Sequence, residues 1–268
     1  MRAAVLLVFV CASGVTGTAC LLPLIDTLSS SKDESPAETP DAASPPPAPA
    51  KADPCSGAVA AWPLDDGTGA VARECTGRFP GKLTGAVSWT TGRGGVGHAL
   101  AFSGGAVALE DAVALRVGGP PQTPAFSAMA WLSARSPDYA RFFLSRSDGR
   151  QDAWAFALYP DTAATVSIGM RLVDKAGSPT DLRSDPVALA PWIHAAAVFD
   201  GQSTMTFYVD GLSKGKRTFA AAQYAPSVAP LRIGAPVTNN APFEGTLSDV
   251  RIYARALSAE EIKAIASK

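Results

Sequence analysis

The sequence has almost no excess of either charge: its 268 residues include 23 Lys and Arg against 24 Asp and Glu. Nucleic-acid binding depends on basic residues that neutralise phosphates, so this balance gives no electrostatic reason to expect a nucleic-acid partner. After residue 20 no apolar run is long enough to cross a bilayer as a helix. The chain also lacks the G-x-S-x-G, H-E-x-x-H and P-loop motifs, so no motif gives its two histidines a catalytic or metal-binding partner.

Residues 1–20 have the organisation of a targeting segment. Arg2 supplies the positive charge, residues 3–12 are apolar, and small residues at 17–19 precede Cys20. This pattern predicts a signal peptide. Its simplest interpretation is a secretory signal that is cleaved near the end of the small-residue run.

The same small residues before a cysteine resemble the lipobox of bacterial lipoproteins, although Gly17 stands where that motif usually has an aliphatic residue. The resemblance implies that Cys20 is acylated and becomes the mature N-terminus, so that the lipid holds the protein on a membrane. Leu21 differs from the Asp that often retains lipoproteins on the inner membrane, which favours the outer membrane. We therefore expect an exported protein that is either anchored by lipid or secreted.

Residues 21–54 are predicted to form a disordered tether rich in Pro, Ala and Ser. From residue 26 onward the stretch has no apolar periodicity and could not bury a core. Pro45, Pro46 and Pro47 favour an extended polyproline conformation, which makes a fairly stiff spacer. The tether precedes a folded domain at residues 55–268, and this layout is typical of a domain held away from a membrane.

Cysteine is scarce, and two of the four cysteines are left for the folded domain. Cys11 lies in the leader and Cys20 is the lipidation candidate, so Cys55 and Cys75 remain as an even pair in an exported chain. Such a pair most simply forms a disulfide. It would close a loop of about 20 residues and stabilise the fold by roughly 3 kcal/mol. Metal binding or a reactive thiol would need a third ligand or an adjacent base, which the sequence does not show.

Residues 192–216 carry the clearest secondary-structure signal in the chain. Ile193–Phe199 is apolar and ends at Asp200-Gly201, and Thr204–Val209 alternates apolar and polar residues before it ends at Asp210-Gly211. Asp-Gly tolerates the positive φ that tight hairpin turns need. The segment therefore predicts an antiparallel meander with one buried face.

Short apolar or alternating runs recur along the rest of the domain, separated by Gly, Pro, Asp and Asn. They cover residues 58–64, 85–89, 99–102, 106–109, 126–134, 141–146, 153–159, 165–173, 230–233 and 245–253. Ser103-Gly104-Gly105 separates the third run from the fourth and predicts a hairpin. Many short strands without long amphipathic helices indicate two packed antiparallel sheets.

One helix is predicted, at the C-terminal end. Ser258 and Glu261 have the spacing of a capping box, and Leu257 and Ile262 lie where a hydrophobic staple would be. Ile262 and Ile265 give this short helix one apolar edge that can dock on a sheet.

Four blocks of sequence resemble the laminin-G-like members of the concanavalin A-like lectin/glucanase superfamily. FEGTLSDVRIYARALSAEEIKAI resembles their closing signature, and PWIHAAAVFDG followed by FYVDG resembles their paired strands. GHALAFSGG and FSAMAWLSAR match two further blocks in the same order, so the resemblance covers nearly all of residues 56–266. It implies an all-β fold, a two-sheet antiparallel jelly-roll sandwich with a curved concave sheet and a short C-terminal helix.

Enzymes of this superfamily cleave glycans with carboxylates in a Glu-x-Asp-x-x-Glu pattern, which places the first two on one face of a strand. No Glu in this chain begins such a pattern, and Glu110 and Asp111 are adjacent, so their side chains would point to opposite faces. Glu260 and Glu261 belong to the helix cap. We therefore expect no catalytic residue of this kind and no hydrolysis by this mechanism.

The resemblance also raises the question of a calcium site, because many laminin-G-like domains hold Ca²⁺ with aspartates and backbone carbonyls. Ca²⁺ takes six to eight oxygen ligands, and Ser103 stands where the family usually has an aspartate. Calcium is thus the one cofactor that the sequence leaves open. The residues that could supply oxygens are Asp65, Asp66, Glu74 and Asp249.

Sugar binding needs a flat aromatic ring together with polar groups that fix the orientation of the sugar. Four aromatic residues near predicted loops are candidates, namely Tyr139, Trp154, Tyr159 and Tyr224. Four tryptophans inside strand patterns are expected in the core, namely Trp62, Trp89, Trp131 and Trp192. Because the sequence places no ring on the concave face, it assigns no ligand-binding site.

His194 aligns with a strand histidine in the family blocks, which implies a structural, hydrogen-bonded role, and His98 lies at the junction of a turn and a strand. The expected function is an exported, non-catalytic binding or adhesion module that recognises a glycan or a cell-surface protein. Two alternatives stay open. One is a structural lipoprotein that packs against a partner in the cell envelope, and the other is a polysaccharide-active enzyme with an unrecognised site.

Overall fold

The computed structural model of the chain describes residues 55–118, 124–135, 137–146, 154–173, 176–219, 229–236 and 240–268. The described residues belong to one compact unit, Pro49–Lys268, and residues 1–54 lie outside them. The predictions for the leader, Cys20, the tether and Tyr224 also fall outside them. Within the described ranges, no helix is both long and apolar enough to cross a membrane.

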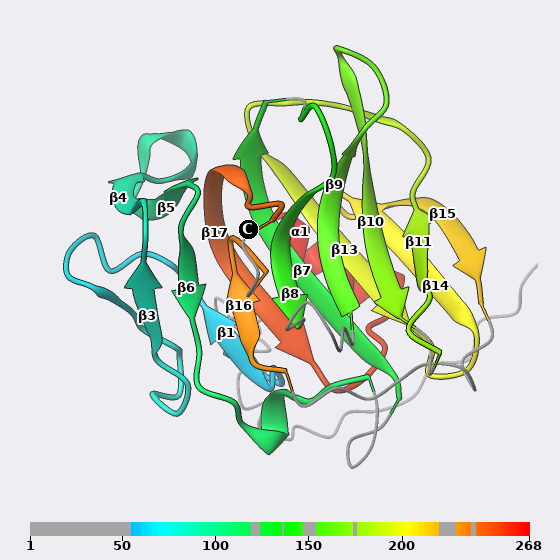
Figure 1. Ribbon diagram of the computed structural model, residues 1–268, viewed down its shortest axis with the longest axis horizontal. Coiled ribbons are helices and arrows are strands. Elements are labelled where there is room, and N and C mark those ends of the chain that lie inside the picture. The colour runs from blue at the N-terminus through cyan, green and yellow to red at the C-terminus, as the bar shows by residue number, and fades with distance from the viewer. Residues whose placement is uncertain are drawn as a thin grey trace, which may run out of the picture. The chain divides into compact units, whose positions relative to one another are not determined.

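Two antiparallel sheets form the domain (Figure 1). Sheet A contains β1 (Ala60–Trp62), β4 (Val87–Thr91), β5 (His98–Ser103), β7 (Phe126–Ala134), β13 (Ile193–Phe199), β14 (Thr204–Val209), β15 (Leu212–Thr218) and β17 (Glu244–Tyr253). Its strand order is β15-β14-β13-β7-β17-β5-β4, and β1 pairs with β17.

Sheet B contains β2 (Val71–Ala72), β3 (Gly81–Thr84), β6 (Ala106–Ala108), β8 (Arg141–Arg146), β9 (Trp154–Pro160), β10 (Thr165–Val173), β11 (Pro179–Arg183), β12 (Val187–Ala188) and β16 (Leu231–Ile233). Its order is β11-β10-β9-β8-β16-β6-β3-β2, and β12 pairs with β10. Three short helices complete the described structure: η1 (Arg93–Gly95), η2 (Val113–Leu115) and α1 (Ala259–Ala266). The predicted all-β jelly-roll sandwich with one short C-terminal helix is confirmed.

The predicted meander is present as β13, β14 and β15, which are neighbours in sheet A. The chain turns at Asp200-Gly201 and at Asp210-Gly211, where Asp210 has a φ of 50°. Met205, Phe207 and Val209 on one face of β14 are buried in the main core between the sheets. The alternation read from the sequence therefore identifies the buried face of this strand.

The hairpin predicted around Ser103-Gly104-Gly105 is wrong. β5 pairs with β4 and β17 in sheet A, whereas β6 pairs with β3 and β16 in sheet B. The turn therefore carries the chain from one sheet to the other. Gly104 has a φ of 95°, and a Cβ on Gly105 would lie 2.5 Å from the carbonyl oxygen of Thr84. Glycine is needed here because the turn passes tightly against β3.

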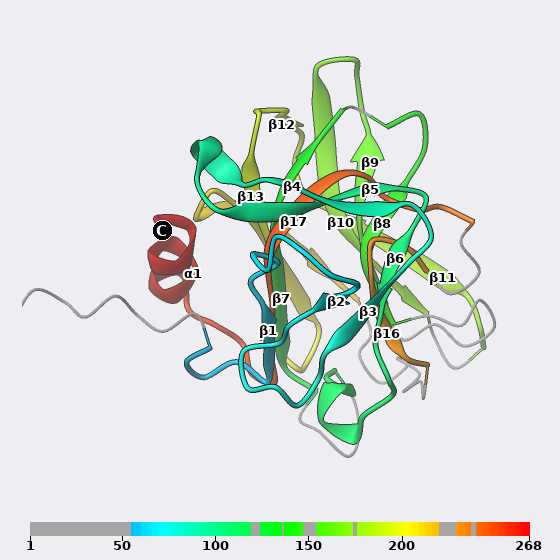
Figure 2. The same cartoon turned by 90° about the vertical axis from the view of Figure 1, so that its left-hand side faces the viewer.

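Helix α1 lies on the face of sheet A that points away from sheet B (Figure 2). Ile262 and Ile265 pack there with Met129 and Tyr253 in a small second apolar cluster. Leu257 belongs to the same cluster, as a hydrophobic staple requires. The apolar edge predicted for this helix is therefore the edge that docks on the sheet.

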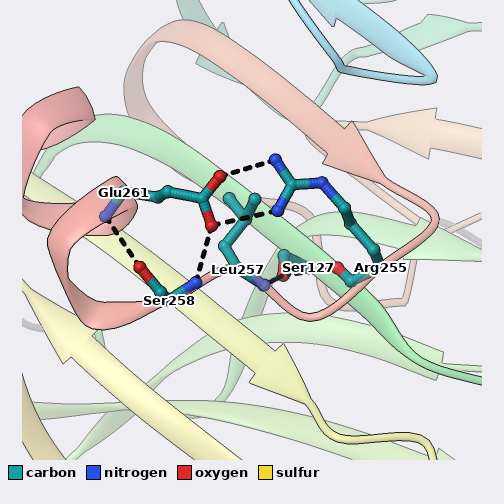
Figure 3. A network of polar contacts seen from close by, with 5 residues as sticks. All are labelled: Ser127, Arg255, Leu257, Ser258 and Glu261. Atoms are coloured by element: carbon teal, nitrogen blue, oxygen red, sulfur yellow. Dashed lines mark hydrogen bonds and ion pairs between the residues drawn. The ribbon is translucent and has the colours of Figure 1, made fainter.

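The capping box of α1 is also confirmed (Figure 3). The Glu261 amide donates to the Ser258 hydroxyl at 3.3 Å, and the Ser258 amide donates to the Glu261 carboxylate at 2.8 Å. Arg255 holds the same carboxylate through both of its terminal nitrogens. Ser127 of β7 accepts from the Leu257 amide and donates to the Arg255 carbonyl, which ties the start of the helix to sheet A.

The N-terminal corner, residues 55–78, is held by a disulfide and by one buried carboxylate. Cys55 and Cys75 are bonded, as the sequence predicts, with their Cα atoms 5.6 Å apart. Such a bond is typical of exported proteins. The Glu74 side chain is only 4 % exposed. It accepts from the amides of Ala61, Thr76 and Arg78 and from the Thr76 hydroxyl.

Candidate functional site

A cavity of about 590 Å³ opens at one rim of the sandwich, and we call it the rim pocket. It lies where β7 ends, β8 begins and β17 begins. A neighbouring pocket of about 480 Å³ shares Arg135, Pro137 and Asp138 with it. The rim pocket is lined by Ser133, Ala134, Arg135, Pro137, Asp138, Arg141, Leu158, Phe243, Glu244, Gly245 and Thr246.

The pairing of β7 with β17 sets the shape of the rim pocket. Gly245 lies opposite Ala134, and Thr246 lies opposite Ser133. Gly245 has a φ of 151°, and a Cβ at this position would lie 2.4 Å from the carbonyl oxygen of Ser133. Only glycine fits this close approach of the two strands.

Arg141, which lines the rim pocket, contacts a carboxylate of the same lining and an aromatic ring outside it. Its guanidinium forms an ion pair with Glu244 at 3.0 Å and donates to the Pro242 carbonyl at 3.3 Å. It also stacks on the Tyr139 ring, with its central carbon 4.1 Å from the ring centroid. The Tyr139 side chain is 48 % exposed, so one ring face is held in place while the residue stays open to solvent. An exposed flat ring beside charged hydrogen-bonding groups is the chemistry that sugars require.

The other aromatic candidates do not offer exposed rings. The Trp154 side chain is fully buried and stacks on Phe126 at 5.5 Å in the main core. Tyr159 is 1 % exposed and lies under the Arg183 guanidinium at 4.0 Å. Both predictions of a loop-exposed ring are wrong, because each residue lies within β9, whose side chains are covered on both faces.

The expectation of core positions holds for only part of the tryptophan set. Trp62 is fully buried in the main core, and the partly buried Trp89 packs against that core. Trp192 is half-buried at the start of β13. Trp131 is 8 % exposed, but it lies outside the main core and is covered by Arg93, whose central carbon is 3.5 Å from the ring centroid.

His194 corrects another expectation. Its ring is fully buried on β13 beside Trp131, with ring centroids 5.3 Å apart, yet neither ring nitrogen has a hydrogen-bond partner among the described residues. Burial, followed by the nearby Arg251 and Arg93 charges, lowers the pKa of His194 to about 3. The ring is therefore neutral at physiological pH. Its backbone is hydrogen-bonded to Asp210: the His194 amide donates to the Asp210 carboxylate at 2.8 Å, and the His194 carbonyl accepts from the Asp210 amide at 2.9 Å.

The four calcium candidates do not gather at one place. Glu74 is engaged in the N-terminal corner, Asp66 accepts from the Arg73 amide, and Asp249 is held by Arg251 through both carboxylate oxygens at 2.6 Å. Asp65 pairs with His98. Within the described ranges, no group of three or more His, Cys, Asp or Glu side chains could hold a metal ion. Calcium binding stays a prediction, which a shift of the melting temperature on adding calcium would test.

The acidic pair Glu110-Asp111 lies in a loop after β6. Asp111 binds Arg116, and the buried Arg146 lies 3.5 Å from its carboxylate. The hydrogen bond from Arg116 lowers the pKa of Asp111, so this carboxylate stays ionised and acts as a structural counter-ion.

Sequence reasoning identified Tyr139 but missed the residues that surround it. Arg141 and Glu244 lie about a hundred positions apart in the chain, and nothing in either local pattern connects them. They meet because the chain just before β17 runs beside the start of β8, where Phe142 bridges to Pro242 and its amide donates to the Ala241 carbonyl at 3.0 Å.

Comparisons with known proteins agree with this fold. A sequence model of the concanavalin A-like lectin/glucanases superfamily matches residues 103–263. Among curated protein sequences, none matches this chain.

Three solved structures share the architecture. Domain 4 of AbnA, an extracellular arabinanase from Geobacillus stearothermophilus in complex with arabinotriose, aligns with a TM-score of 0.57 at 20 % identity, over 78 % of this chain and 98 % of that one. The binding domain of botulinum neurotoxin DC in complex with rat synaptotagmin II aligns with a TM-score of 0.57 at 12 % identity, over 79 % of this chain and 51 % of that one. A Trypanosoma rangeli sialidase in complex with the inhibitor DANA aligns with a TM-score of 0.53 at 16 % identity, over 77 % of this chain and 32 % of that one.

Proposed function

Because the chain belongs to the concanavalin A-like lectin/glucanase superfamily, we propose that its folded domain is a non-catalytic module that binds a glycan at the rim pocket. The observation that carries this proposal is the exposed Tyr139 ring, which stacks on Arg141, a residue that lines the rim pocket. The ring offers an apolar face to a sugar, and Glu244, Asp138 and Arg135 offer hydrogen-bonding groups beside it.

The shape of the site favours a ligand of more than one sugar unit. The rim pocket and the neighbouring pocket lie side by side and share Arg135, Pro137 and Asp138 in their linings. Two neighbouring pockets can take several units of a chain, with one unit over the ring and the next toward Asp161 and Thr162. The arabinotriose complex of the similar arabinanase domain supports an oligosaccharide ligand.

The test compares glycan-array binding of the wild type with that of Tyr139→Ala and Tyr139→Phe. Loss of the ring removes about 1 kcal/mol of stacking, which corresponds to roughly fivefold weaker binding. Tyr139→Phe keeps the ring and should keep most of the affinity. Leu212→Ala, which removes an exposed apolar side chain from β15, is the matched control and should have no effect.

Three results would contradict the proposal or favour an alternative. Equal glycan binding by the wild type and Tyr139→Ala would show that the glycan does not bind at the rim pocket. Release of new reducing ends from a bound glycan would show turnover and favour the polysaccharide-active alternative. Binding to no glycan, together with stable capture of one envelope partner, would favour the structural lipoprotein.

We further propose that acylated Cys20 anchors the protein in a membrane and that residues 21–54 hold the domain away from its surface. The small residues before Cys20 and the proline-rich composition after it support this arrangement. Mass spectrometry of the mature N-terminus should show a lipid on Cys20. Cys20→Ser should move the protein from the membrane fraction to the soluble fraction, and an unmodified Cys20 in the wild type would contradict anchoring.

A further inference from the structure

A second cavity, of about 800 Å³, opens on the α1 side of sheet A, and we call it the helix-side pocket. The teal loop that holds η1 lies on the same side of the sheet as α1 in Figure 2. Arg93 and Val96 of this loop, Trp131 of β7, Asp249 and Arg251 of β17 and the terminal Lys268 line the cavity. It shares no lining residue with the rim pocket.

Arg93 is the unsatisfied charge of the helix-side pocket. Its guanidinium stacks on Trp131 with its central carbon 3.5 Å from the ring centroid. Within the described part of the chain, the Arg93 side chain forms no hydrogen bond and no ion pair. Stacking engages only the face of a guanidinium, so the five N–H donors around its edge keep their capacity to bind an acceptor.

Among the described residues no carboxylate pairs directly with Arg93, and Asp249 and Asp210 attract it only from a distance. Arg251 is bound by Asp249 through two hydrogen bonds of 2.6 Å. Asp65 pairs with His98, whose ring nitrogen lies 3.5 Å from its carboxylate. Asp249 is therefore engaged by Arg251, and the edge donors of Arg93 have no direct acceptor among the described residues.

The composition of the pocket indicates what kind of anion would complete it. A guanidinium presents a planar fork that matches a carboxylate through two parallel hydrogen bonds, and the Trp131 ring fixes the plane of that fork. Val96 is 78 % exposed at the mouth and offers an apolar surface next to the charge. A cavity of this volume accommodates a small organic ligand, whereas an inorganic ion would leave most of it empty.

We infer that the helix-side pocket binds a carboxylate-bearing sugar, such as a uronic acid unit of an acidic polysaccharide, and that Arg93 holds its carboxylate. The ring atoms of the sugar lie against Val96 and the uncovered edge of Trp131. This second site extends the proposed glycan binding to acidic glycans, and it does not depend on the rim pocket. The neutral His194 beside Trp131 adds no competing positive charge to the site.

The experiment measures binding of D-glucuronate to the full-length protein by calorimetry, with the methyl ester of glucuronate and D-glucose as neutral probes. We expect glucuronate to bind at least about tenfold more tightly than either neutral probe, as a charge-assisted bidentate contact requires. Arg93→Gln should lose about tenfold or more in glucuronate affinity. Arg93→Lys should recover only part of it, because an ammonium lacks the planar fork.

Arg73→Gln is the matched control, because Arg73 is an exposed arginine paired with Asp66 and lines neither pocket. It should bind glucuronate as the wild type does. The indole N–H signal of Trp131 should shift on adding glucuronate to the wild type and should not shift in Arg93→Gln. Unfolding curves of each variant show that the fold is kept.

Three results would overturn the inference: equal affinity for glucuronate and for its methyl ester, unchanged glucuronate binding by Arg93→Gln, or tighter binding of inorganic sulfate than of glucuronate. Loss of neutral-glycan binding in Tyr139→Ala concerns the rim pocket alone. Dependence of glucuronate binding on Arg93 concerns the helix-side pocket alone, so the two proposals can fail separately.

Discussion

In the N-terminal corner the carboxylate of Glu74 is buried and accepts from three backbone amides and one hydroxyl. In the helix-side pocket the guanidinium of Arg93 has only the Trp131 ring, and the His194 ring nitrogens beside it have no partner among the described residues. A charged group whose hydrogen bonds are all made within the fold holds that fold together. A partly exposed charge without a partner adds little to stability and is free to bind a ligand. Mutation of Glu74 should therefore lower the stability of the fold strongly, whereas mutation of Arg93 should lower ligand affinity and change stability little.

The largest effect on stability is expected for Glu74→Ala. The substitution leaves the amides of Ala61, Thr76 and Arg78 without their acceptor in a buried turn, and each orphaned donor costs about 1–3 kcal/mol. Chemical unfolding should show a loss of at least about 3 kcal/mol. Glu110→Ala, at an exposed carboxylate, is the control and should change stability by less than about 0.5 kcal/mol. Equal stability of the two variants would show that the buried Glu74 carboxylate does not stabilise the fold.

The Cys55–Cys75 disulfide should contribute next. It closes a separation of 20 residues, and its loss should cost about 3 kcal/mol in the chain-entropy model. Cys55→Ser with Cys75→Ser is compared with the wild type in oxidising and reducing buffer. The reduced wild type should match the double variant. Insensitivity of the wild type to reduction would show that the corner is held by Glu74 alone.

His194 should make the domain sensitive to acid. Burial lowers its pKa from 6.5 to about 3, so between these values the unfolded chain binds a proton that the folded domain does not. Stability is then fully present above about pH 6.5 and falls toward pH 3 by up to about 1.4 kcal/mol per pH unit. Urea unfolding from pH 7 to pH 4 should show a smaller slope for His194→Leu than for the wild type. A slope unaffected by His194→Leu would contradict this account.

The smallest effect on stability is expected for Arg93→Gln. Stacking of an exposed guanidinium on an indole contributes about 0.5–1 kcal/mol, and no ion pair or hydrogen bond is lost with it. The melting temperature should stay within roughly 2–4 °C of the wild type, while glucuronate affinity falls. A large drop in melting temperature would place Arg93 with Glu74 as a structural residue and end the contrast between the two regions.

Local chemistry explains which parts of the fold could be predicted from the sequence. The Asp-Gly turns around β14 and the capping box of α1 are formed by residues close together in the chain, so their patterns are read directly. The turn at residues 103–105 has equally clear local chemistry, yet it joins two sheets. Whether β5 and β6 pair depends on β17 and β16, which are more than a hundred residues away.

The candidate sites were less predictable than the fold for the same reason. Tyr139 was recognised because it follows a strand end, but Trp154 and Tyr159 were expected at loops and are buried within β9. Arg93 gave no signal in a glycine-rich loop, because its importance comes from the Trp131 ring that it covers. Ion pairs between distant strands decide which charged side chains stay available to a ligand. The local sequence of one strand does not predict such pairs.

By itself the sequence determined the class of fold, the strand faces of the meander, the capped terminal helix and the identity of the cysteine pair. Each of these depends on residue spacing or on contacts between near neighbours, which the order of residues encodes directly. Only the tertiary structure decided which aromatic rings are exposed, that the chain changes sheets at residues 103–105, and that Arg141 meets Glu244 while Arg93 forms no direct ion pair within the described residues. These features depend on the register between strands distant in sequence, because that register brings a charge to its partner or leaves it alone.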